Sequence, residues 1–162
     1  MKDPQDKKRH YVYLAGSISA DDQTYTWREE FRELTKDLPV VCLDPTLNQF
    51  NQKLRRFQSS VNLSKAAKVR AQRILRPKDY QLIKIASVVV VNLAFSDPEK
   101  PMIGTIQELV WAHDIFYLPI LALTMGVENP YTRNNWIDEC CSAKVETVEE
   151  AVEMLKTFFL EF

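Results

Sequence analysis

Two carboxylates lie beside apolar segments of this chain where an acid could do chemistry. Glu108 follows Gly104-Thr105, at the start of a segment whose pattern predicts a helix. Asp79 opens a shorter predicted helix that leads into the apolar run VVVVNL at 88–93. The positive end of a helix dipole favours an ionised carboxylate, which suits a nucleophile. Either residue could instead serve only to stabilise or cap its helix.

Other candidate residues lie at the ends of predicted strands. Tyr13 is inside the apolar run YVYLAG, where it could also be a core aromatic residue, and Gly16-Ser17 ends that run. Asn92 lies near the end of VVVVNL. A Gly-Ser turn after a strand is a weak phosphate-binding signal without further glycines. The chain has only three glycines, which excludes a P-loop and a dinucleotide fingerprint.

Apolar runs and helical spacing predict the elements that position these residues. The run 88–93 does not alternate between apolar and polar residues, which indicates a strand buried on both faces, as in a parallel sheet. The stretch 46–63 reads as a loop or lid. The predicted strands are 11–16, 40–43, 88–93, 119–124 and an edge strand at 144–146. The predicted helices contain Trp27 to Leu34, 64–76 with an end at Pro77, Asp79 to Ala86, Gly104 to about Phe116, and a final helix from Thr147 that Glu150 completes as a capping box.

Strands that alternate with helices predict an α/β domain with right-handed crossovers. We expect one domain over 11–162 after a polar tail at 1–10, with a five-stranded, mostly parallel sheet between helices. This is a flavodoxin-like or Rossmann-like three-layer sandwich. Ligands bind such sheets at the carboxyl ends of the strands beside the topological switch point. The loops after 11–16 and 88–93 are therefore the expected site.

Composition narrows the class of protein. The chain has 162 residues, of which 46% are hydrophobic and 27% charged, an ordinary globular balance. No apolar run approaches the roughly 20 residues that cross a bilayer, and the polar start MKDPQDKKRH lacks a secretory h-region. We therefore expect a cytoplasmic protein. The three cysteines lack CxxC spacing, and we expect reduced thiols and not a strained vicinal disulfide between Cys140 and Cys141. With only two histidines a zinc site is also disfavoured, so we expect no metal.

The segment from Pro45 to Lys78 is strongly basic. It contains nine lysines and arginines and no acid, although the whole chain has a net charge of −1. Such a segment could bring a phosphate to the site, form a solvated face, or contact another subunit. A role in nucleic-acid binding is disfavoured, because Phe57 is the only aromatic residue between the first and last of these charges, Lys53 and Lys78.

The candidate residues together resemble a known family. The segments YLAGSI at 13–18 and GTIQELVWA at 104–112, the strand VVVVNL, and Asp79 seven residues before Ala86 are similar to the nucleoside 2-deoxyribosyltransferase family. That family includes the 2′-deoxynucleoside 5′-phosphate N-hydrolases. The resemblance covers roughly residues 11–125, and the Trp27-Arg28 pair fits it too.

The resemblance implies a mechanism. Glu108 would attack C1′ of the sugar and form a covalent deoxyribosyl-enzyme, as in retaining glycosidases. Asp79 would protonate or orient the departing base, and Tyr13 would hydrogen-bond the nucleophile or the sugar. No cofactor is implied, and the expected partners are a deoxynucleoside or deoxynucleotide and a free nucleobase. The expected substrate-binding residues in this chain are Gly16, Ser17, Asn92, Met102, Gly104 and Thr105.

The sequence departs from the family pattern at two places near the nucleophile. Met102 stands where many members have an aspartate, and Val110 adds bulk where ELGYA is usual. In the family, a segment after the fourth strand commonly completes the site of a neighbouring subunit. Here that segment is 129–138, which makes Asn134 or Asn135 candidate contacts to the 5′ end of the substrate and predicts a homo-oligomer, a dimer or higher.

Three functions follow from these residues. The acids Asp21 and Asp22 after GSISA disfavour a phosphate, and GTIQE resembles the transferase form of the nucleophile loop, so transfer of deoxyribose between bases is the leading hypothesis. The basic segment favours the alternative, an N-glycosidase that hydrolyses 2′-deoxynucleoside 5′-monophosphates. A non-catalytic nucleotide-binding or sensing module is a third interpretation, which the joint presence of Tyr13, Asp79 and Glu108 disfavours.

Overall fold

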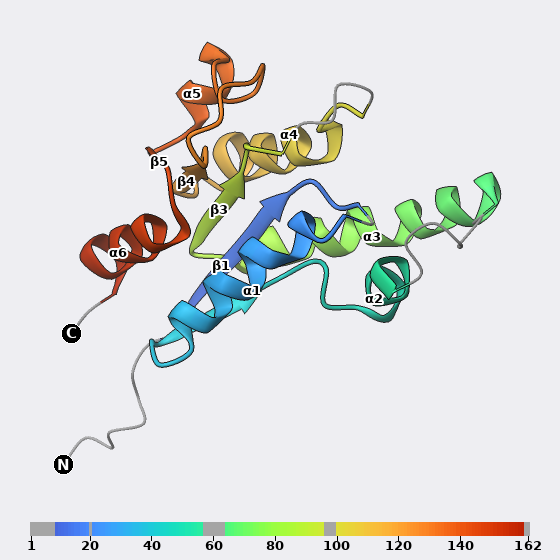
Figure 1. The fold of residues 1–162 in the computed structure, drawn as a ribbon, viewed down its shortest axis with the longest axis horizontal. Helices are drawn as coiled ribbons and strands as arrows, with labels where there is room; N and C mark the ends of the chain where they lie inside the picture. Colours follow the sequence, from blue (N-terminus) through green and yellow to red (C-terminus); the bar gives the residue numbers. More distant parts are fainter. Residues whose placement is uncertain (1–8, 20, 57–63, 96–99, 161–162) are drawn as a thin grey trace.

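In a computed structural model, the chain is described over residues 9–19, 21–56, 64–95 and 100–160. A single five-stranded sheet forms its centre (Figure 1). Its strands are β1 His10–Gly16, β2 Val40–Leu43, β3 Val88–Asn92, β4 Ile120–Leu123 and β5 Ala143–Val145. The strand order is β2-β1-β3-β4-β5, and all four pairings are parallel. The predicted parallel α/β fold is confirmed.

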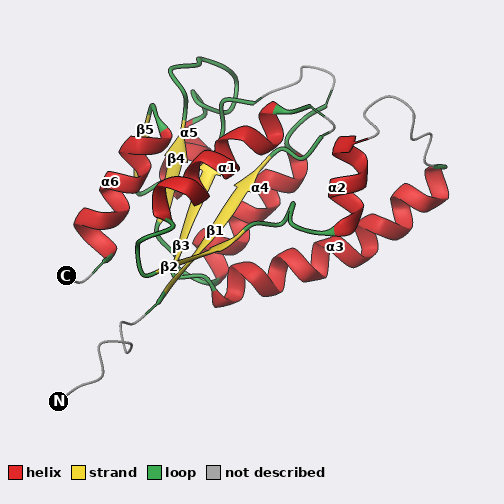
Figure 2. Ribbon diagram, turned by 60° about the horizontal axis from the view of Figure 1, so that its bottom comes forward, coloured by secondary structure: helices red, strands yellow, loops and turns green. Residues whose placement is uncertain are grey.

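Helices cover both faces of the sheet (Figure 2). Alternate residues of each strand face opposite layers, because the side-chain period of a strand is two residues. Val12 and Leu14 of β1 pack in one core cluster with α1 (Gln23–Thr35) and α6 (Val148–Phe159). Tyr13 and Ala15 pack in the other, with α3 (Lys65–Ile85) and α4 (Ile103–Val110). The result is the predicted three-layer sandwich.

One long helix replaces two predicted short ones. α3 runs without a break from Lys65 to Ile85 and contains Pro77, which we expected to end a helix. A proline inside a helix lacks the N–H that would bond the carbonyl four residues earlier, here that of Arg73. Both residues are exposed, so water can bind that carbonyl. Asp79 therefore lies inside a helix, and the prediction that it opens one is wrong.

Part of the predicted loop at 46–63 is also helical. α2 spans Gln49–Arg56, whereas residues 57–63 lie outside the described residues. The buried side-chain amide of Asn51 donates to the Pro45 carbonyl at 3.2 Å, and the main-chain carbonyl of Asn51 accepts from the Tyr25 hydroxyl at 3.2 Å. These contacts fix α2 against the start of α1. The sequence did not predict α2, because its residues are mostly polar.

The helix that carries Glu108 begins earlier than expected. α4 starts at Ile103, so Gly104 and Thr105 lie inside it and Glu108 is in its second turn, not its first. A π-helical segment, η1 (Trp111–Ile115), continues α4 to Phe116. Single π-helical turns within α-helices are frequent at functional sites. The dipole at the start of α4 thus acts on Glu108 from farther away than we expected.

The C-terminal elements close the sheet edge. α5 (Asn135–Cys140) precedes β5, and the Thr147 hydroxyl accepts from the Glu150 N–H at 3.1 Å at the start of α6, as the capping-box pattern predicts. Cys42, Cys140 and Cys141 are free thiols. Within the described ranges, no helix is long and apolar enough to cross a membrane, and no three or more His, Cys, Asp or Glu side chains gather where they could hold a metal ion.

Candidate active site

The carboxyl ends of β1 and β3 open into a cavity of about 790 Å³. These strands are neighbours at the point where the strand order reverses, which is where ligands bind in such sheets. The volume suits a small organic ligand. Its walls come from the turn after β1, the loop after β3, the start of α4 and the face of α3. The lining residues predicted from the sequence are Gly16, Ser17, Asp79, Met102, Gly104, Thr105 and Glu108.

A buried hydrogen bond joins two of the predicted residues. The Tyr13 hydroxyl donates to Oε1 of Glu108 at 2.7 Å. Tyr13 is fully buried in β1 and does not line the cavity, whereas Glu108 is 9% exposed and does. Oε2 of Glu108 has no hydrogen bond to any described residue. Tyr13 therefore holds the carboxyl group from behind and leaves one oxygen available to a ligand.

Burial dominates the acidity of Glu108. Loss of solvent raises the pKa of Glu108 to about 8. The hydrogen bond from Tyr13 opposes this rise, the negative charge of Asp79 adds to it, and the positive charge of Arg28 opposes it. Burial and the nearby Glu108 carboxylate also raise the pKa of Tyr13 well above its usual value, so Tyr13 stays a donor.

Asp79 lies on the opposite wall, on α3. Its side chain is 14% exposed, and its Oδ1 is 3.7 Å from Nζ of Lys78, an ion pair beyond hydrogen-bonding distance. Oδ1 has no hydrogen-bond partner among the described residues. Burial raises the pKa of Asp79 to about 6, although the Lys78 ammonium group opposes the rise. Two carboxyl groups of different acidity thus face one cavity, an arrangement that can exchange a proton with a ligand near neutral pH.

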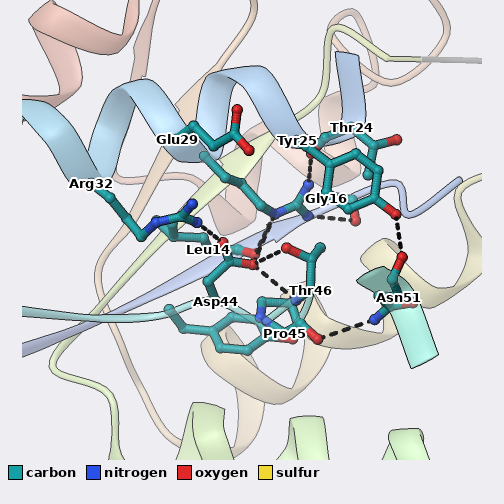
Figure 3. A network of polar contacts seen from close by, with 12 residues as sticks. Leu14, Gly16, Thr24, Tyr25, Glu29, Arg32, Asp44, Pro45, Thr46 and Asn51 are labelled. Atoms are coloured by element: carbon teal, nitrogen blue, oxygen red, sulfur yellow. Dashed lines mark hydrogen bonds and ion pairs between the residues drawn. The ribbon is translucent and has the colours of Figure 1, made fainter. Parts of the chain in front are cut away.

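A buried arginine, Arg28, supports the wall of the cavity that the turn after β1 forms, called the Gly16 wall below. Gly16 has a φ of +149°, and a Cβ at this position would lie 3.4 Å from Nη2 of Arg28. That nitrogen donates to the Gly16 carbonyl at 3.1 Å, and Asp44 forms an ion pair with the same guanidinium group (Figure 3). Sequence reasoning assigned Arg28 no role beyond the Trp27-Arg28 pair, since an arginine in an amphipathic helix usually faces solvent.

The loop after β3 is tied to a distant segment. The N–H of buried Met102 donates to the Tyr131 hydroxyl at 2.8 Å, and the Asn129 amide donates to the Leu93 carbonyl at 2.8 Å. The segment 129–134 thereby supports the loop that leads into α4. A Cβ at Gly104 would meet nothing within 4 Å, so the start of α4 leaves open space beside the carboxyl groups.

Three predicted residues lie away from the cavity. Asn92 is buried at the end of β3, where its side chain accepts from the Ala94 N–H at 2.9 Å and shapes the turn. Asn134 caps α5 by accepting from the N–H of Trp136 at 2.9 Å. Asn135 is the first residue of α5. The contact of Asn134 or Asn135 with the site of a second subunit stays a prediction.

A side chamber of about 430 Å³ adjoins the carboxyl groups. Asp79 and Glu108 line both cavities, and Arg76 and Trp111 close the chamber, with the guanidinium 5.7 Å from the centre of the indole ring. Helical spacing places Gln72, Arg76 and Asp79 on one face of α3. The sequence contained this signal, but the expected end of the helix at Pro77 concealed it. Asp21, which the sequence had already pointed to, also lines the main cavity. Other lining residues that the sequence did not indicate are Ile18, Ser19, Leu75, Phe95, Lys100, Pro101, Ile103 and Gln107.

Solved structures share this fold. A 2-deoxyribosyltransferase from Bacillus psychrosaccharolyticus matches with a TM-score of 0.62 at 18% sequence identity, over 87% of this chain and 89% of its own. A 2-deoxyribosyltransferase from Leishmania mexicana matches with a TM-score of 0.65 at 16% identity, over 93% of this chain and 99% of its own. A CMP N-glycosidase from Clostridium botulinum matches with a TM-score of 0.50 at 16% identity, over 92% and 99%.

These likenesses establish the fold over nearly the whole chain. No protein-family model and no curated protein matches the sequence. The fold expected from the resemblance to nucleoside 2-deoxyribosyltransferases is confirmed, since two of these neighbours carry that name and the third is an N-glycosidase. Fold alone does not define chemistry, which the residues at the cavity have to support.

Proposed function

We propose that this chain belongs to the nucleoside 2-deoxyribosyltransferase family and cleaves the N-glycosidic bond of 2′-deoxynucleosides. The observation that carries the proposal is the 2.7 Å hydrogen bond from buried Tyr13 to Glu108, with Asp79 on the same cavity. A double displacement at C1′ requires an oriented carboxylate and a second acid, and Glu108 and Asp79 would supply these two groups. The resemblance of the sequence and the fold of the solved neighbours support the same chemistry.

Glu108 is the nucleophile in this mechanism. Its carboxylate attacks C1′ as the bond between C1′ and the base nitrogen breaks, and the electron pair of that bond leaves with the base. Asp79, in its acid form, gives the departing base a proton. The product is a deoxyribosyl ester of Glu108. An acceptor base then attacks C1′, Asp79 recovers a proton from it, and the Glu108 carboxylate is released.

Transfer to a second base is the proposed outcome. The turn after β1 supports a nucleoside substrate, because Asp21 lines the far part of the cavity and would repel a 5′-phosphate. The active protein is expected to be a homo-oligomer, with Asn134 or Asn135 of a second copy near the 5′ end of the sugar. Its expected setting is nucleoside salvage in the cytoplasm.

Hydrolysis of a 5′-monophosphate is the second candidate. The observation that favours it is the side chamber, which Arg76 lines together with Asp79 and Glu108 and where Arg76 forms no ion pair with any described residue. A phosphate dianion would supply that missing charge. Water would then replace the acceptor base in the second step.

An assay with purified protein separates these functions. Each 2′-deoxynucleoside and its 5′-monophosphate is incubated with and without a free acceptor base, and the products are separated by chromatography. A new deoxynucleoside that forms only with acceptor supports the transferase, whereas free base released from a monophosphate without acceptor supports the hydrolase. Saturable binding without turnover of any of these compounds would contradict both and favour a sensing module.

Mass spectrometry of the denatured protein tests the covalent step. After brief mixing with substrate, we expect a deoxyribosyl adduct on the peptide that contains Glu108. The adduct should be absent from Glu108→Gln and present in Glu153→Gln, which removes an exposed carboxylate on α6. Turnover by wild-type protein without any trapped adduct, even after rapid acid quench, would argue for direct displacement.

A further inference from the structure

Arg28 is a fully buried cation that does not reach the cavity. Its guanidinium group donates to three main-chain carbonyls: Leu14 from Nε at 3.4 Å, Gly16 from Nη2 at 3.1 Å, and Thr24 from Nη1 (Figure 3). These carbonyls belong to β1, to its last residue and to the first turn of α1. One side chain therefore fixes the strand end that precedes the cavity wall against the helix that follows it.

The charge of Arg28 is only partly neutralised. Its nearest carboxylate is the buried Asp44, whose Oδ1 lies 3.7 Å from Nε. The other oxygen of Asp44 pairs with Arg32, and Oδ1 also accepts from the Thr46 N–H at 2.9 Å and hydroxyl at 2.6 Å. One carboxylate thus faces two guanidinium groups. A net positive charge remains inside the protein, where low polarisability makes it act over longer distances than in water.

Glu108 is the next acid that this charge affects. The charges that influence Glu108 are those of Asp79 on α3 and Arg28 on α1, beside the hydrogen bond from Tyr13 on β1. Asp21 and Lys100 line the farther part of the cavity, and Arg76 lines the side chamber. Of these cations, Arg28 is the one whose charge lowers the pKa of Glu108, and Glu108 in turn stabilises charged Arg28.

We propose that Arg28 is a positioning residue for the deoxyribosyl transfer, which holds the Gly16 wall in place and supplies a fixed positive charge behind the Glu108 carboxylate. This inference rests on the proposed function for its consequence in catalysis. One group has both effects. The Arg28 guanidinium group donates to the Gly16 carbonyl through Nη2, and the positive charge of the same group acts on Glu108. The absence of a side chain at Gly16 permits this close approach.

Two substitutions separate the charge from the geometry. Arg28→Gln removes the charge and keeps a donor, so we expect the pKa of Glu108 to rise by about one pH unit, the lower end of the effect of a nearby opposite charge. Arg28→Lys keeps the charge, so the pKa should stay close to that of wild type. However, one ammonium group cannot reach the carbonyls of Leu14, Gly16 and Thr24 together, so kcat/KM should fall with Lys as well.

The titration of Glu108 is measured by carbon NMR of protein labelled in the glutamate carboxyl groups. Glu108→Gln identifies the signal, and the alkaline limb of kcat/KM against pH is measured in parallel. Arg55→Gln is the control, since Arg55 pairs with Asp22 and Glu29 of the α1 region but is not among the groups that influence Glu108. It should leave the titration unchanged.

If Arg28→Gln folds and the pKa of Glu108 in it equals that of wild type, the inference is wrong. It is also wrong if Arg55→Gln shifts this pKa as much as Arg28→Gln does. If Arg28→Gln does not fold, Asp44→Asn carries the test. It keeps Arg28 and removes its counter-charge, so the pKa of Glu108 should fall, and an unchanged value contradicts the inference. The NMR titration needs no turnover, so an inactive wild-type protein would reject the proposed function without affecting this result.

Discussion

The Tyr13 hydroxyl lies 2.7 Å from Oε1 of Glu108, although 95 positions separate the two residues in the chain. The parallel sheet creates this contact. β1 and β3 are neighbours, Tyr13 pairs in register with Val89, and α4 returns over the face of the sheet that Tyr13 occupies. The two-residue period of β1 decides that Tyr13 points toward α4, whereas Val12 and Leu14 point toward α1.

Removal of the Glu108 carboxyl group should abolish turnover. We expect Glu108→Ala and Glu108→Gln to reduce the rate to the level without enzyme, because no other carboxylate of the described chain receives the Tyr13 hydrogen bond. Circular dichroism should show an unchanged fold. Full activity in either variant would remove the central claim.

Tyr13→Phe should weaken catalysis and shift its pH dependence. The lost hydrogen bond to a charged acceptor is worth about 1.5–3 kcal/mol, so we expect kcat/KM to fall by roughly tenfold to a hundredfold. Because this bond lowers the pKa of Glu108, which sets the upper limit of the pH profile, the alkaline limb should also move to higher pH. Tyr11→Phe is the control, since Tyr11 is half-exposed on the same strand. A drop in rate with an unmoved alkaline limb would indicate a purely steric role.

The pH profile of the wild-type protein should be bell-shaped. With pKa values of about 6 for Asp79 and about 8 for Glu108, the pair holds one proton between these limits, mainly on Glu108. The reactive form is the minor one, in which Asp79 holds this proton and Glu108 is ionised. Below this window both groups are protonated and no nucleophile exists. Above it both are ionised and no proton is available for the base. We expect kcat/KM to fall on both sides.

Asp79→Asn should remove the alkaline limb. The rate at the optimum should fall by about 10²–10⁴-fold, the usual contribution of a general acid. The remaining group is Glu108, whose pKa should fall once the charge of Asp79 is gone. The rate should then rise with pH to a plateau. Asp114→Asn is the control, since the Asp114 side chain is exposed on η1, and it should keep the bell-shaped pH profile. If Asp79→Asn also keeps a bell-shaped profile, another group supplies the proton.

Glu108 should also lower the stability of the protein at neutral pH. Its pKa is about 8 in the folded chain against an ordinary value of 4.5, so the native state binds the proton more tightly than the unfolded state. Stability should therefore fall as the pH rises from about 4.5 to 8, by up to about 1.4 kcal/mol per pH unit. Glu108→Gln lacks this loss, and it should gain stability relative to wild type between pH 5 and pH 8 in urea unfolding. If the difference in the free energy of unfolding between Glu108→Gln and wild type is the same at pH 5 and pH 8, Glu108 does not have a raised pKa in the folded protein.

The sheet was predictable because its signals are local. The run 88–91 is apolar at every position, and its residues pack alternately in the two core clusters. The capping pair Thr147 and Glu150 marked the start of α6 for the same reason, since four consecutive residues suffice to form it. The elements that were misplaced depend on distant contacts. Pro77 ends a helix in isolation, but here α3 continues past it, where Tyr80 and Ile83 pack against the core.

The sequence by itself determined the residue types of the candidate site and the two strands that carry it, since strand burial and the order of motifs are properties of the chain. Only the tertiary structure decided which of these residues meet. It brought Tyr13 to Glu108, placed Asp79 on the wall opposite, and left Asn92 to shape a turn. It also buried Arg28 behind the nucleophile, because a charge inside a protein is set by the groups around it and not by its neighbours in sequence.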